Sequence, residues 1–470
     1  MEILRGLQPE RVFALFEEIC SIPHGSGNTV GIRRFCLDFA EKLGLEAICD
    51  SGNNVIIKKH ASKGLEAHAT VILQGHLDMV CEKEPQLDFN FDSDSLKLAV
   101  NGDTISACGT TLGGDDGIAV AMILAVLENN TLRHPPLEAV FTADEETGML
   151  GASVLDASLL NGRMLINIDS EEEGVLTVGC AGGARVDMVL PLSPAENSYD
   201  CYTVSVTGLT GGHSGMEIDK GRLNANKVMG DLLSAIGDVR LVELHGGGKD
   251  NAIPCECVCT IAAAADPTDA IHDFDRSLDR SKEHGMRISV TPTGKHTTSF
   301  DQAGSLSFLQ LLKALPNGIV SMSESIPGLV ETSLNLGRLS ADSMTGKFTF
   351  SVRSSVEESL NRLIRQLEQT AKEFGAECAV RGQYPAWEYR TESRLRDVMR
   401  DAYQSMFGAE PRIVTIHAGL ECGILSHKIP GLDAVSFGPN LYDVHTVRER
   451  MSVSSVARTY AYLCRVLSDL

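Results

Sequence analysis

Apolar residues near the start of the chain recur at the spacing of one helix face. The pattern predicts a helix over 9–19 and a second over 32–43, after which Gly44 stands where a C-terminal cap belongs. Short apolar runs at 71–73, 137–142 and 164–168 then alternate with helical stretches, of which one is at 117–128. This alternation is typical of a largely parallel sheet covered by helices on both faces.

The pattern changes after the glycine-rich segment CAGGAR (180–185). A β-α-β-β-α-β order is predicted first, with strands at 202–206, 239–244, 252–261 and 286–290 and helices at 223–236 and 267–284. The order is approximated again, with a helix from 305, strands near 329–339 and 347–352, a helix at 356–374 and a strand at 377–380. We therefore expect an α+β insert made of two related halves.

Near Tyr389 the first pattern returns, with a helix at 395–406, strands at 413–416 and 434–437, and a last helix at 453–467. By length alone, 470 residues would give about three domains. The return of the pattern instead predicts one α/β domain, formed by 1–184 and 389–470, that is interrupted by an insert at 185–388.

The composition restricts the partners and the location of the protein. Lys and Arg number 41 against 63 Asp and Glu, a net charge of −22, which argues against binding nucleic acid or an anionic membrane. The longest apolar stretch, 118–127, is too short for the roughly 20 residues that cross a bilayer. No secretory signal is visible at the start, and 13 scattered cysteines show no disulfide framework, so we expect a reduced, soluble, cytoplasmic protein.

Three of the cysteines alternate in the segment PCECVCT. At strand period, Cys255, Cys257 and Cys259 would all lie on one face of a strand. Small hydrophobic residues on a buried strand face are the favoured interpretation, and a thiolate metal site is the alternative.

Acidic and imidazole side chains follow several of the predicted strands. They are His76 and Asp78 in GHLD, Asp115 and Asp116 in GTTLGGDDG, Asp144, Glu145 and Glu146 after LEAVFTA, Asp169 after MLINI, and His445 after AVSFG. A single acidic pair after a strand is usually a solvated turn or a helix start. Several together are significant, because α/β sheets hold their ligands at the ends of strands.

These residue types suit a pair of metal ions. Histidine nitrogen and carboxylate oxygen bind Zn²⁺ at about 2.0–2.2 Å, and a bridging carboxylate can give one oxygen to each of two ions. In an adjacent Glu pair, one carboxylate can bind a metal while the other takes a proton from water. The spacing of His76 and Asp78 would let a carboxylate fix the imidazole tautomer.

The motifs that carry these residues resemble those of a known family. GHLDMV, GTTLGGDDGIAVA, TADEETGMLGA, INIDSEEEG, GGHSG, DNAIP, HAGLECGIL and DVHTVRERM are similar to motifs of the aminoacyl-histidine dipeptidases, also called Xaa-His dipeptidases or peptidase D. These enzymes belong to the dizinc aminoacylase, carboxypeptidase and dipeptidase metallopeptidases. The resemblance runs from residue 76 to 451, and it implies a zinc-peptidase-like catalytic domain with a lid and dimerisation insert.

The resemblance also implies two Zn²⁺ ions per chain, with Co²⁺ or Mn²⁺ as substitutes. Asp115 would bridge the two ions. His76 and Asp169 would complete the ligands of one ion, and Glu146 and His445 those of the other.

Further roles follow from the same resemblance. Glu145 would be the general base and acid, and Asp78 would orient His76. The first aspartate of GGDD matches the bridging position, which leaves Asp116 as a neighbour, and we favour a structural role for it, as a cap near the positive end of the following helix.

The insert would contribute catalytic and binding groups. His213 would reach the active site of the partner subunit and stabilise the oxyanion, helped by Asn251, and Arg353 would bind the substrate carboxylate. An exposed loop histidine, a turn asparagine and a surface ion-pair arginine are the respective alternatives. His417 and Glu421 could line the pocket or be plain helix-end polar residues.

The expected function is therefore a cytoplasmic, homodimeric dizinc metalloprotease that hydrolyses dipeptides, with Xaa-His dipeptides as the expected class. A related dizinc tripeptidase or an N-acyl amino acid deacylase is the alternative within this chemistry. A noncatalytic relative that binds metal or peptide is the alternative of another class, and it would be expected to lose Glu145 or a metal ligand.

Overall fold

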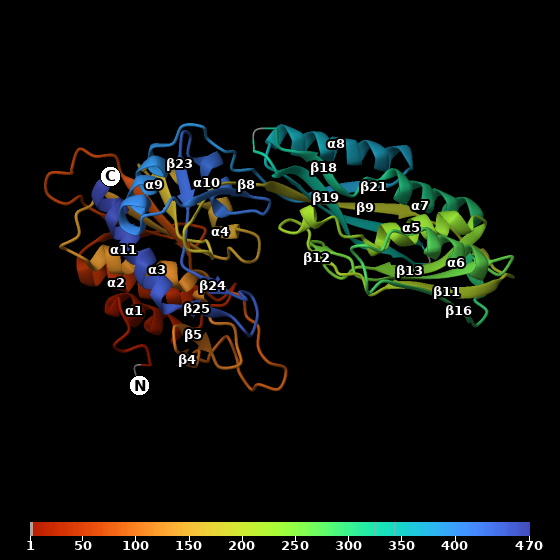
Figure 1. Ribbon diagram of the computed structural model, residues 1–470, viewed down its shortest axis with the longest axis horizontal. Helices are drawn as coiled ribbons and strands as arrows, with labels where there is room; N and C mark the ends of the chain where they lie inside the picture. Colours follow the sequence, from red (N-terminus) through yellow and green to blue (C-terminus); the bar gives the residue numbers. More distant parts are fainter. Residues whose placement is uncertain (1–2, 325, 343) are drawn as a thin grey trace. The chain divides into compact units, whose positions relative to one another are not determined.

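The computed structural model describes residues 3–324, 326–342 and 344–470, and the chain divides into two compact units (Figure 1). Unit 1 contains the described residues up to Cys180, together with Tyr389–Thr415 and Leu420–Leu470; unit 2 contains Ala181–Glu388 and Ile416–Gly419. Residues 181–184 and 416–419, which the sequence analysis assigned to the interrupted domain, therefore lie in unit 2.

An eight-stranded sheet forms the centre of unit 1. In spatial order its strands are β1 (Glu46–Cys49), β2 (Val55–Lys59), β6 (Leu137–Thr142), β3 (Val71–His76), β7 (Met164–Asn167), β23 (Asp433–Ser436), β8 (Val175–Cys180) and β22 (Arg412–Ile416). The four central strands, β6, β3, β7 and β23, run parallel to one another, and antiparallel pairs flank them. The predicted α/β class with a mostly parallel sheet is confirmed, although β1, β2 and β8 were not predicted.

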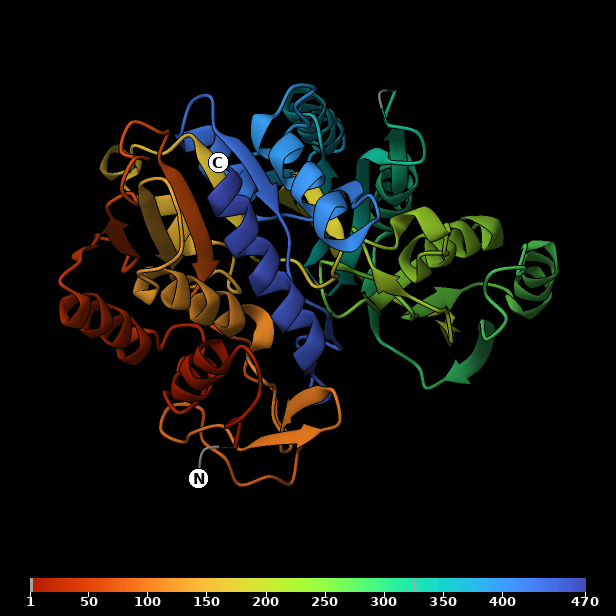
Figure 2. The ribbon, with the colours of Figure 1, turned by 60° about the vertical axis from the view of Figure 1, so that its left-hand side comes forward.

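Helices cover both faces of this sheet (Figures 1 and 2). They are α1 (Glu10–Cys20), α2 (Val30–Leu43), α3 (Gly114–Glu128), α4 (Leu150–Val154), α9 (Arg394–Phe407), α10 (Glu421–Lys428) and α11 (Val453–Asp469), with a short 3-10 helix at Ala157–Leu159. Val71 and Leu73 of β3 share one core with α1, α2, α3, α9 and α11, whereas the alternate residue Ile72 faces the side that carries α4 and α10. Helix α3 is buried all round, as expected of a helix with no polar face.

A small four-stranded sheet joins two distant parts of unit 1. Its strands, in order, are β24 (Leu441–Tyr442), β25 (Arg450–Ser452), β5 (Thr104–Ala107) and β4 (Leu98–Asn101). The pairing of β25 with β5 brings the segment after His445 beside the segment that leads to Asp115.

A nine-stranded antiparallel sheet forms unit 2. Its path is β16 (Arg287–Thr293), β11 (Asp200–Thr207), β15 (Cys257–Ala263), β13 (Val239–Gly246), β19 (Val330–Ala341), β20 (Thr345–Ser354), β9 (Gly182–Pro191) and β21 (Glu377–Tyr384), with β18 (Gly318–Met322) paired to β19. Two short ladders are added, β10 (Pro194–Glu196) with β17 (Thr298–Phe300) and β12 (Gly212–His213) with β14 (Ala252–Ile253).

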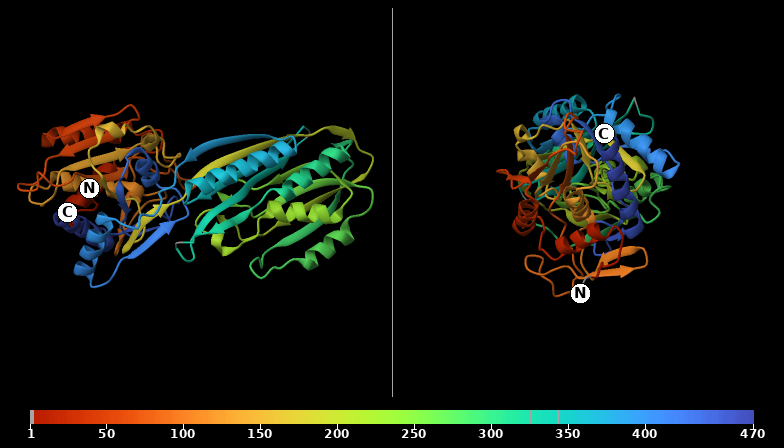
Figure 3. Two further views of the ribbon diagram at one scale, coloured as in Figure 1. Left: turned by 90° about the horizontal axis from the view of Figure 1, so that it is seen from above. Right: turned by 90° about the vertical axis from the view of Figure 1, so that its left-hand side faces the viewer.

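The strand order reveals the two related halves of the insert. Helices α5 (Ala225–Ile236), α6 (Thr268–Ser277), α7 (Gln302–Ala314) and α8 (Glu357–Glu373) lie on one face of the sheet (Figure 3), and a 3-10 turn covers Ile218–Lys220. Numbered by their place in each half, the strands β11, β13, β15 and β16 lie in the order 4-1-3-2, and so do β9, β19, β20 and β21. Strand β9, which was not predicted, supplies the first strand of the second half.

Two local predictions in the insert are wrong. The helix predicted over 267–284 ends at Ser277, because the buried carboxylate of Glu283 instead accepts hydrogen bonds from the Thr210 and Leu223 N–H groups. The cysteine run does not share one strand face. Strand β15 begins only at Cys257, so Cys257 and Cys259 are buried while Cys255 is exposed.

Within the described part of the chain, no helix has both the length and the apolar character needed to span a membrane.

Candidate metal centre

Asp115 lies between two histidines at the start of α3. Its Oδ1 is 3.1 Å from His76 Nε2, and its Oδ2 is 3.1 Å from His445 Nε2. His445 Nε2 is also 2.8 Å from Glu146 Oε1. Each oxygen of one carboxylate thus faces a different imidazole, which is the geometry that a bridging ligand requires.

The tautomer of His76 makes a metal ion fit this arrangement. The Nδ1–H group donates to the Asp78 carbonyl oxygen at 2.9 Å, so in the neutral ring Nε2 carries the lone pair. This lone pair and the Asp115 oxygen are both acceptors, and only a cation or an added proton between them relieves their repulsion.

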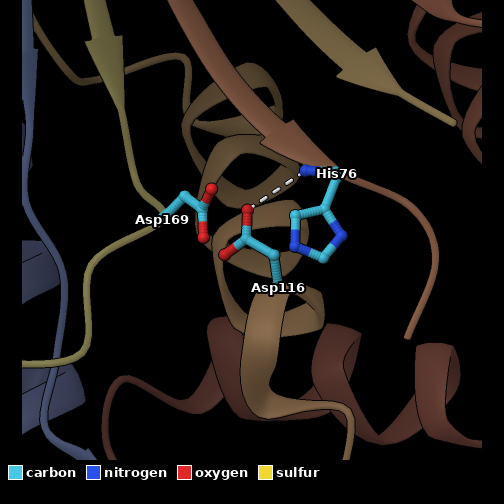
Figure 4. A group of neighbouring side chains, drawn as sticks. All are labelled: His76, Asp116 and Asp169. Atoms are coloured by element: carbon cyan, nitrogen blue, oxygen red, sulfur yellow. Dashed lines mark hydrogen bonds between the residues drawn. The ribbon is translucent and has the colours of Figure 1, made fainter. Parts of the chain in front are cut away.

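A second group lies beside the first, at the ends of β3 and β7 (Figure 4). His76, Asp116 and Asp169 each offer one ligand atom, all within 4.8 Å of one another. Asp116 Oδ2 accepts the His76 backbone N–H at 3.1 Å, and its approach depends on Gly75, where a Cβ would lie 2.6 Å from the same oxygen.

Asp116 therefore does not act as the predicted helix cap. Its backbone and that of Asp115 have non-helical dihedral angles, so regular helix begins only after them. The side chain instead turns toward the end of β3. In the structure it stands with Asp169 and His76 in a group that could hold a metal ion, where the sequence analysis had expected Asp115.

Asp78 holds the adjacent glutamates in place. Its Oδ1 accepts the Glu145 N–H at 2.9 Å, and its Oδ2 accepts the Glu146 N–H at 3.2 Å and the Ser26 hydroxyl at 2.8 Å. The carboxylate also lies 3.5 Å from His76 Nδ1. The backbone carbonyl of Asp78 orients His76 more directly than its side chain does.

The local electrostatics reflect burial and crowding. Burial, with Glu421 and Glu146 nearby, raises the pKa of Glu145 to about 8. Burial and the neighbouring Asp116 raise the pKa of Asp169 well above its usual range. Burial opposes the charged form of Asp115, but hydrogen bonds with His445 and His76 still lower its pKa. Hydrogen bonds with Asp115 and Glu146 raise the pKa of His445 to about 11.

Among the described residues, three overlapping groups could hold metal ions. They are His76, Asp116 and Asp169; His76, Glu145 and Glu146; and Asp115, Glu146 and His445. Nitrogen and oxygen donors of this kind suit Zn²⁺ and its common substitutes. All five predicted metal ligands belong to at least one of these groups.

The predicted residues of the insert form a separate group within unit 2. His213 Nδ1 accepts the N–H groups of Gly215 at 3.2 Å and Met216 at 3.0 Å. A neutral ring that accepts at Nδ1 carries its hydrogen on Nε2, so His213 presents an N–H donor. Burial and the nearby Arg353 lower its pKa, which favours the neutral ring.

Arg353 and His417 stand beside His213. A Cβ at Gly215 would lie 3.1 Å from Arg353 Nε, 3.1 Å from His213 Cε1 and 2.4 Å from the His417 carbonyl oxygen, so only glycine leaves this space open. Arg353 Nη1 donates to the Tyr384 hydroxyl at 3.1 Å. Among the described residues, no ion pair of Arg353 with a carboxylate is found, in contrast to the surface ion-pair alternative.

The other two candidates differ in their surroundings. Asn251 is exposed, and its backbone carbonyl accepts the Ser214 N–H at 2.9 Å next to the short β12–β14 ladder.

 This hydrogen bond joins two backbone groups, so it leaves the Asn251 amide side chain available. Glu421 is fully buried at the start of α10, where it accepts hydrogen bonds from Gln74 Nε2 and the Thr142 hydroxyl, both at 2.6 Å. It therefore lies in the interior of unit 1, bound to β3 and β6, and is not an exposed helix-end residue.

Comparison with known proteins identifies the family. The model of peptidase family M20/M25/M40 matches residues 72–469. The chain belongs to this family. The cytosol non-specific dipeptidase of Escherichia coli is 34% identical over the whole of this chain and 99% of its own. The predicted recognition and enzyme class, a peptide-bond hydrolase related to the dipeptidases of this family, are confirmed.

Solved structures of relatives agree with the fold of this M20 peptidase. The aminoacylhistidine dipeptidase of Vibrio alginolyticus is 34% identical, with a TM-score of 0.90 over 99% of this chain and 98% of its own. The aminopeptidase PepT of Bacillus cereus is 16% identical, with a TM-score of 0.60 over 98% of this chain and 99% of its own, and this likeness concerns the fold.

Several supporting residues were not found by sequence reasoning. Gly75 leaves space for Asp116, Gly215 leaves space for Arg353 and His213, and Ser26 donates a hydrogen bond to the Asp78 carboxylate. Tyr384 contacts the Arg353 guanidinium from β21. Gly75 and Gly215 carried a signal, because they belong to the GHLDMV and GGHSG motifs; Ser26 and Tyr384 act through contacts between segments distant in sequence.

The position of Asp115 predicts that its loss disrupts metal binding. Wild-type protein prepared without chelator should contain about two zinc-like ions per chain, since one bridging carboxylate serves both. Asp115→Ala should lose at least one of them in element analysis. Asp401→Ala, at an exposed position on α9 with a side chain 70% accessible, should keep both. An unchanged metal content in Asp115→Ala would contradict the bridging role.

The two adjacent glutamates should separate in a mutational test. A general base contributes about 10²–10⁴-fold to a rate, so Glu145→Gln should lose turnover to this extent while metal content stays near that of the wild type. Glu146→Gln should lose metal instead, because Glu146 faces His445 in a candidate metal group. Full activity in Glu145→Gln would refute this assignment.

Proposed function

We propose that this M20 peptidase is a dipeptidase that works with two divalent metal ions, Zn²⁺ in the first place. The observation that carries the proposal is the Asp115 carboxylate between His76 and His445, with Glu145 and Glu146 beside it. Dipeptidase relatives that are 34% identical over nearly their full length support the substrate class. We also propose a cytoplasmic location, in agreement with the name of the E. coli relative.

The division of roles follows from the positions of the side chains. Bound metal ions supply Lewis acidity, which polarises a peptide carbonyl and makes water easier to deprotonate. Glu145 takes the proton from the attacking water and delivers it to the leaving amine. Its pKa of about 8 suits a group that must both accept and release a proton near neutral pH. Asp78 orients the Glu145 backbone for this transfer.

The insert residues bind the substrate and the developing charge. The Nε2–H group of His213 donates to the oxyanion of the tetrahedral intermediate, and Asn251 assists it. The Arg353 guanidinium binds the free C-terminal carboxylate in a forked geometry, which limits the substrate to short peptides. His417, beside Arg353, lines the same pocket.

The quaternary arrangement is part of the proposal. Two chains form a homodimer, and His213 of each chain serves the metal centre of the other. His213 stands in unit 2, on the short ladder of β12 with β14, whereas every proposed metal ligand lies in unit 1.

The substrate class can be tested with metal-reconstituted protein and a peptide panel. We expect release of free amino acids from dipeptides, Xaa-His among them, with little turnover of a tripeptide or an N-acetyl amino acid. Loss of charge-assisted hydrogen bonds to the carboxylate, about 1.5–3 kcal/mol, should make a dipeptide amide roughly 10- to 100-fold poorer in kcat/KM. Preferred cleavage of the tripeptide or of the N-acetyl amino acid would favour the alternative enzymes.

The exchange of His213 between subunits predicts complementation. His213→Ala and Glu145→Gln should each be nearly inactive alone. A mixed dimer would contain one site with an intact Glu145 and an intact His213 from the partner, so mixing equal amounts should restore about one site in four. If subunits exchange and no activity returns, His213 does not act in the partner's site.

A further inference from the structure

Glu449 is a buried carboxylate that faces a row of backbone N–H groups. Its side chain follows His445 by four residues and is only 3% exposed. Glu449 Oε2 accepts the Leu112 N–H at 2.8 Å and the Gly113 N–H at 3.3 Å, and Oε1 accepts the Gly114 N–H at 2.8 Å and the Asp115 N–H at 3.4 Å. One carboxylate thus holds four successive residues of the loop that ends at Asp115.

These N–H groups have no other role in the helix. Gly113 is the N-cap of α3 and offers no side chain, and the first N–H groups of a helix have no partner within it. A carboxylate at this end also interacts favourably with the positive end of the helix dipole. Glu449 therefore binds the N–H groups that precede the regular part of α3, whereas Asp116 binds the His76 N–H.

The two ends of this contact carry residues of the metal centre. The loop that Glu449 binds ends at Asp115, whose N–H donates to the Glu449 carboxylate. Glu449 itself lies in the same turn-rich segment as His445, where the Glu449 N–H donates to the Thr446 carbonyl at 3.1 Å. The pairing of β25 with β5 fixes the flanking residues of both segments. Glu449 thus joins the two loops directly beside the centre, in addition to the contact of His445 with Asp115.

We infer that Glu449 is a positioning residue that sets the separation of Asp115 and His445, and thereby the affinity of the centre for metal. This inference rests on the proposed two-metal function. Glu449 touches neither substrate nor metal in this scheme; it acts through the loop of Asp115. Partners that orient metal ligands in this way typically contribute about 10–100-fold to metal affinity or activity.

The chain contains a matched control for this role. Glu138, at the start of β6, is 2% exposed and accepts the N–H groups of Asn161 and Gly162, all at 3.0 Å. It holds a loop in the same manner, but at the end of β6 opposite to the one that leads to Glu145 and Glu146. Its replacement measures the cost of losing a buried loop contact without a change at the metal centre.

Co²⁺ binding distinguishes an effect on the metal centre from a general loss of stability. Apo protein of the wild type, Glu449→Gln and Glu138→Gln is titrated with Co²⁺, with visible absorption as the readout, and melting temperatures are measured in parallel. Glutamine keeps the size of Glu449 but turns an NH₂ donor toward N–H donors, so we expect about 10–100-fold weaker Co²⁺ affinity and an altered spectrum. Glu138→Gln should lower the melting temperature while the wild-type affinity and spectrum persist.

Glu449→Asp keeps the test decisive if the glutamine variant does not fold. It retains the charge but ends one methylene short, so we expect a folded protein with metal affinity between those of the wild type and Glu449→Gln. Wild-type Co²⁺ affinity and spectrum in whichever folded Glu449 variant is measured would overturn the inference. A wild type that binds only one ion would instead count against the two-metal proposal. The inference on Glu449 is judged separately, from the ratio of variant to wild-type Co²⁺ affinity.

Discussion

Carboxylates that are buried close together repel one another, and this constraint governs unit 1. Asp115, Asp116 and Asp169 meet where β3, β7 and α3 approach, and burial raises the pKa of Asp116 and Asp169 well above the usual range. The imidazoles of His76 and His445 lie beside Asp115 and carry a positive charge when they are protonated. Divalent cations relieve the repulsion more fully than two imidazoles do, so the arrangement of acidic groups is itself an argument for metal.

The parts of this centre that follow from strand order could be predicted from the sequence. Parallel strands end at one edge of a sheet, so His76 at the end of β3, Glu146 after β6 and Asp169 after β7 are brought together by the fold alone. The contribution of Glu449 could not be predicted in this way. It depends on the pairing of β25 with β5, and both are short strands with no distinctive apolar pattern.

In the insert, too, contacts between segments distant in sequence could not be predicted. Its helices and most of its strands follow from their periodicity, and the repeated order of elements indicated two halves. Strand β9 was not predicted because it begins within the glycine-rich segment 180–185 and pairs with β20 and β21, more than 150 residues later. The break before Cys257 likewise comes from Pro254, which has no N–H to give to a ladder.

The pKa values of the histidines shift in opposite directions in the two units, because their surroundings differ in charge. In unit 1, hydrogen bonds with Asp115 help to raise the pKa of His76 and His445, since carboxylates favour the positive ring. A metal ion can take the place of that proton. In unit 2, burial and Arg353 lower the pKa of His213, and lower that of His417 to about 4. Neutral rings beside a guanidinium can keep an N–H donor without adding charge, which suits the role proposed for His213 beside Arg353.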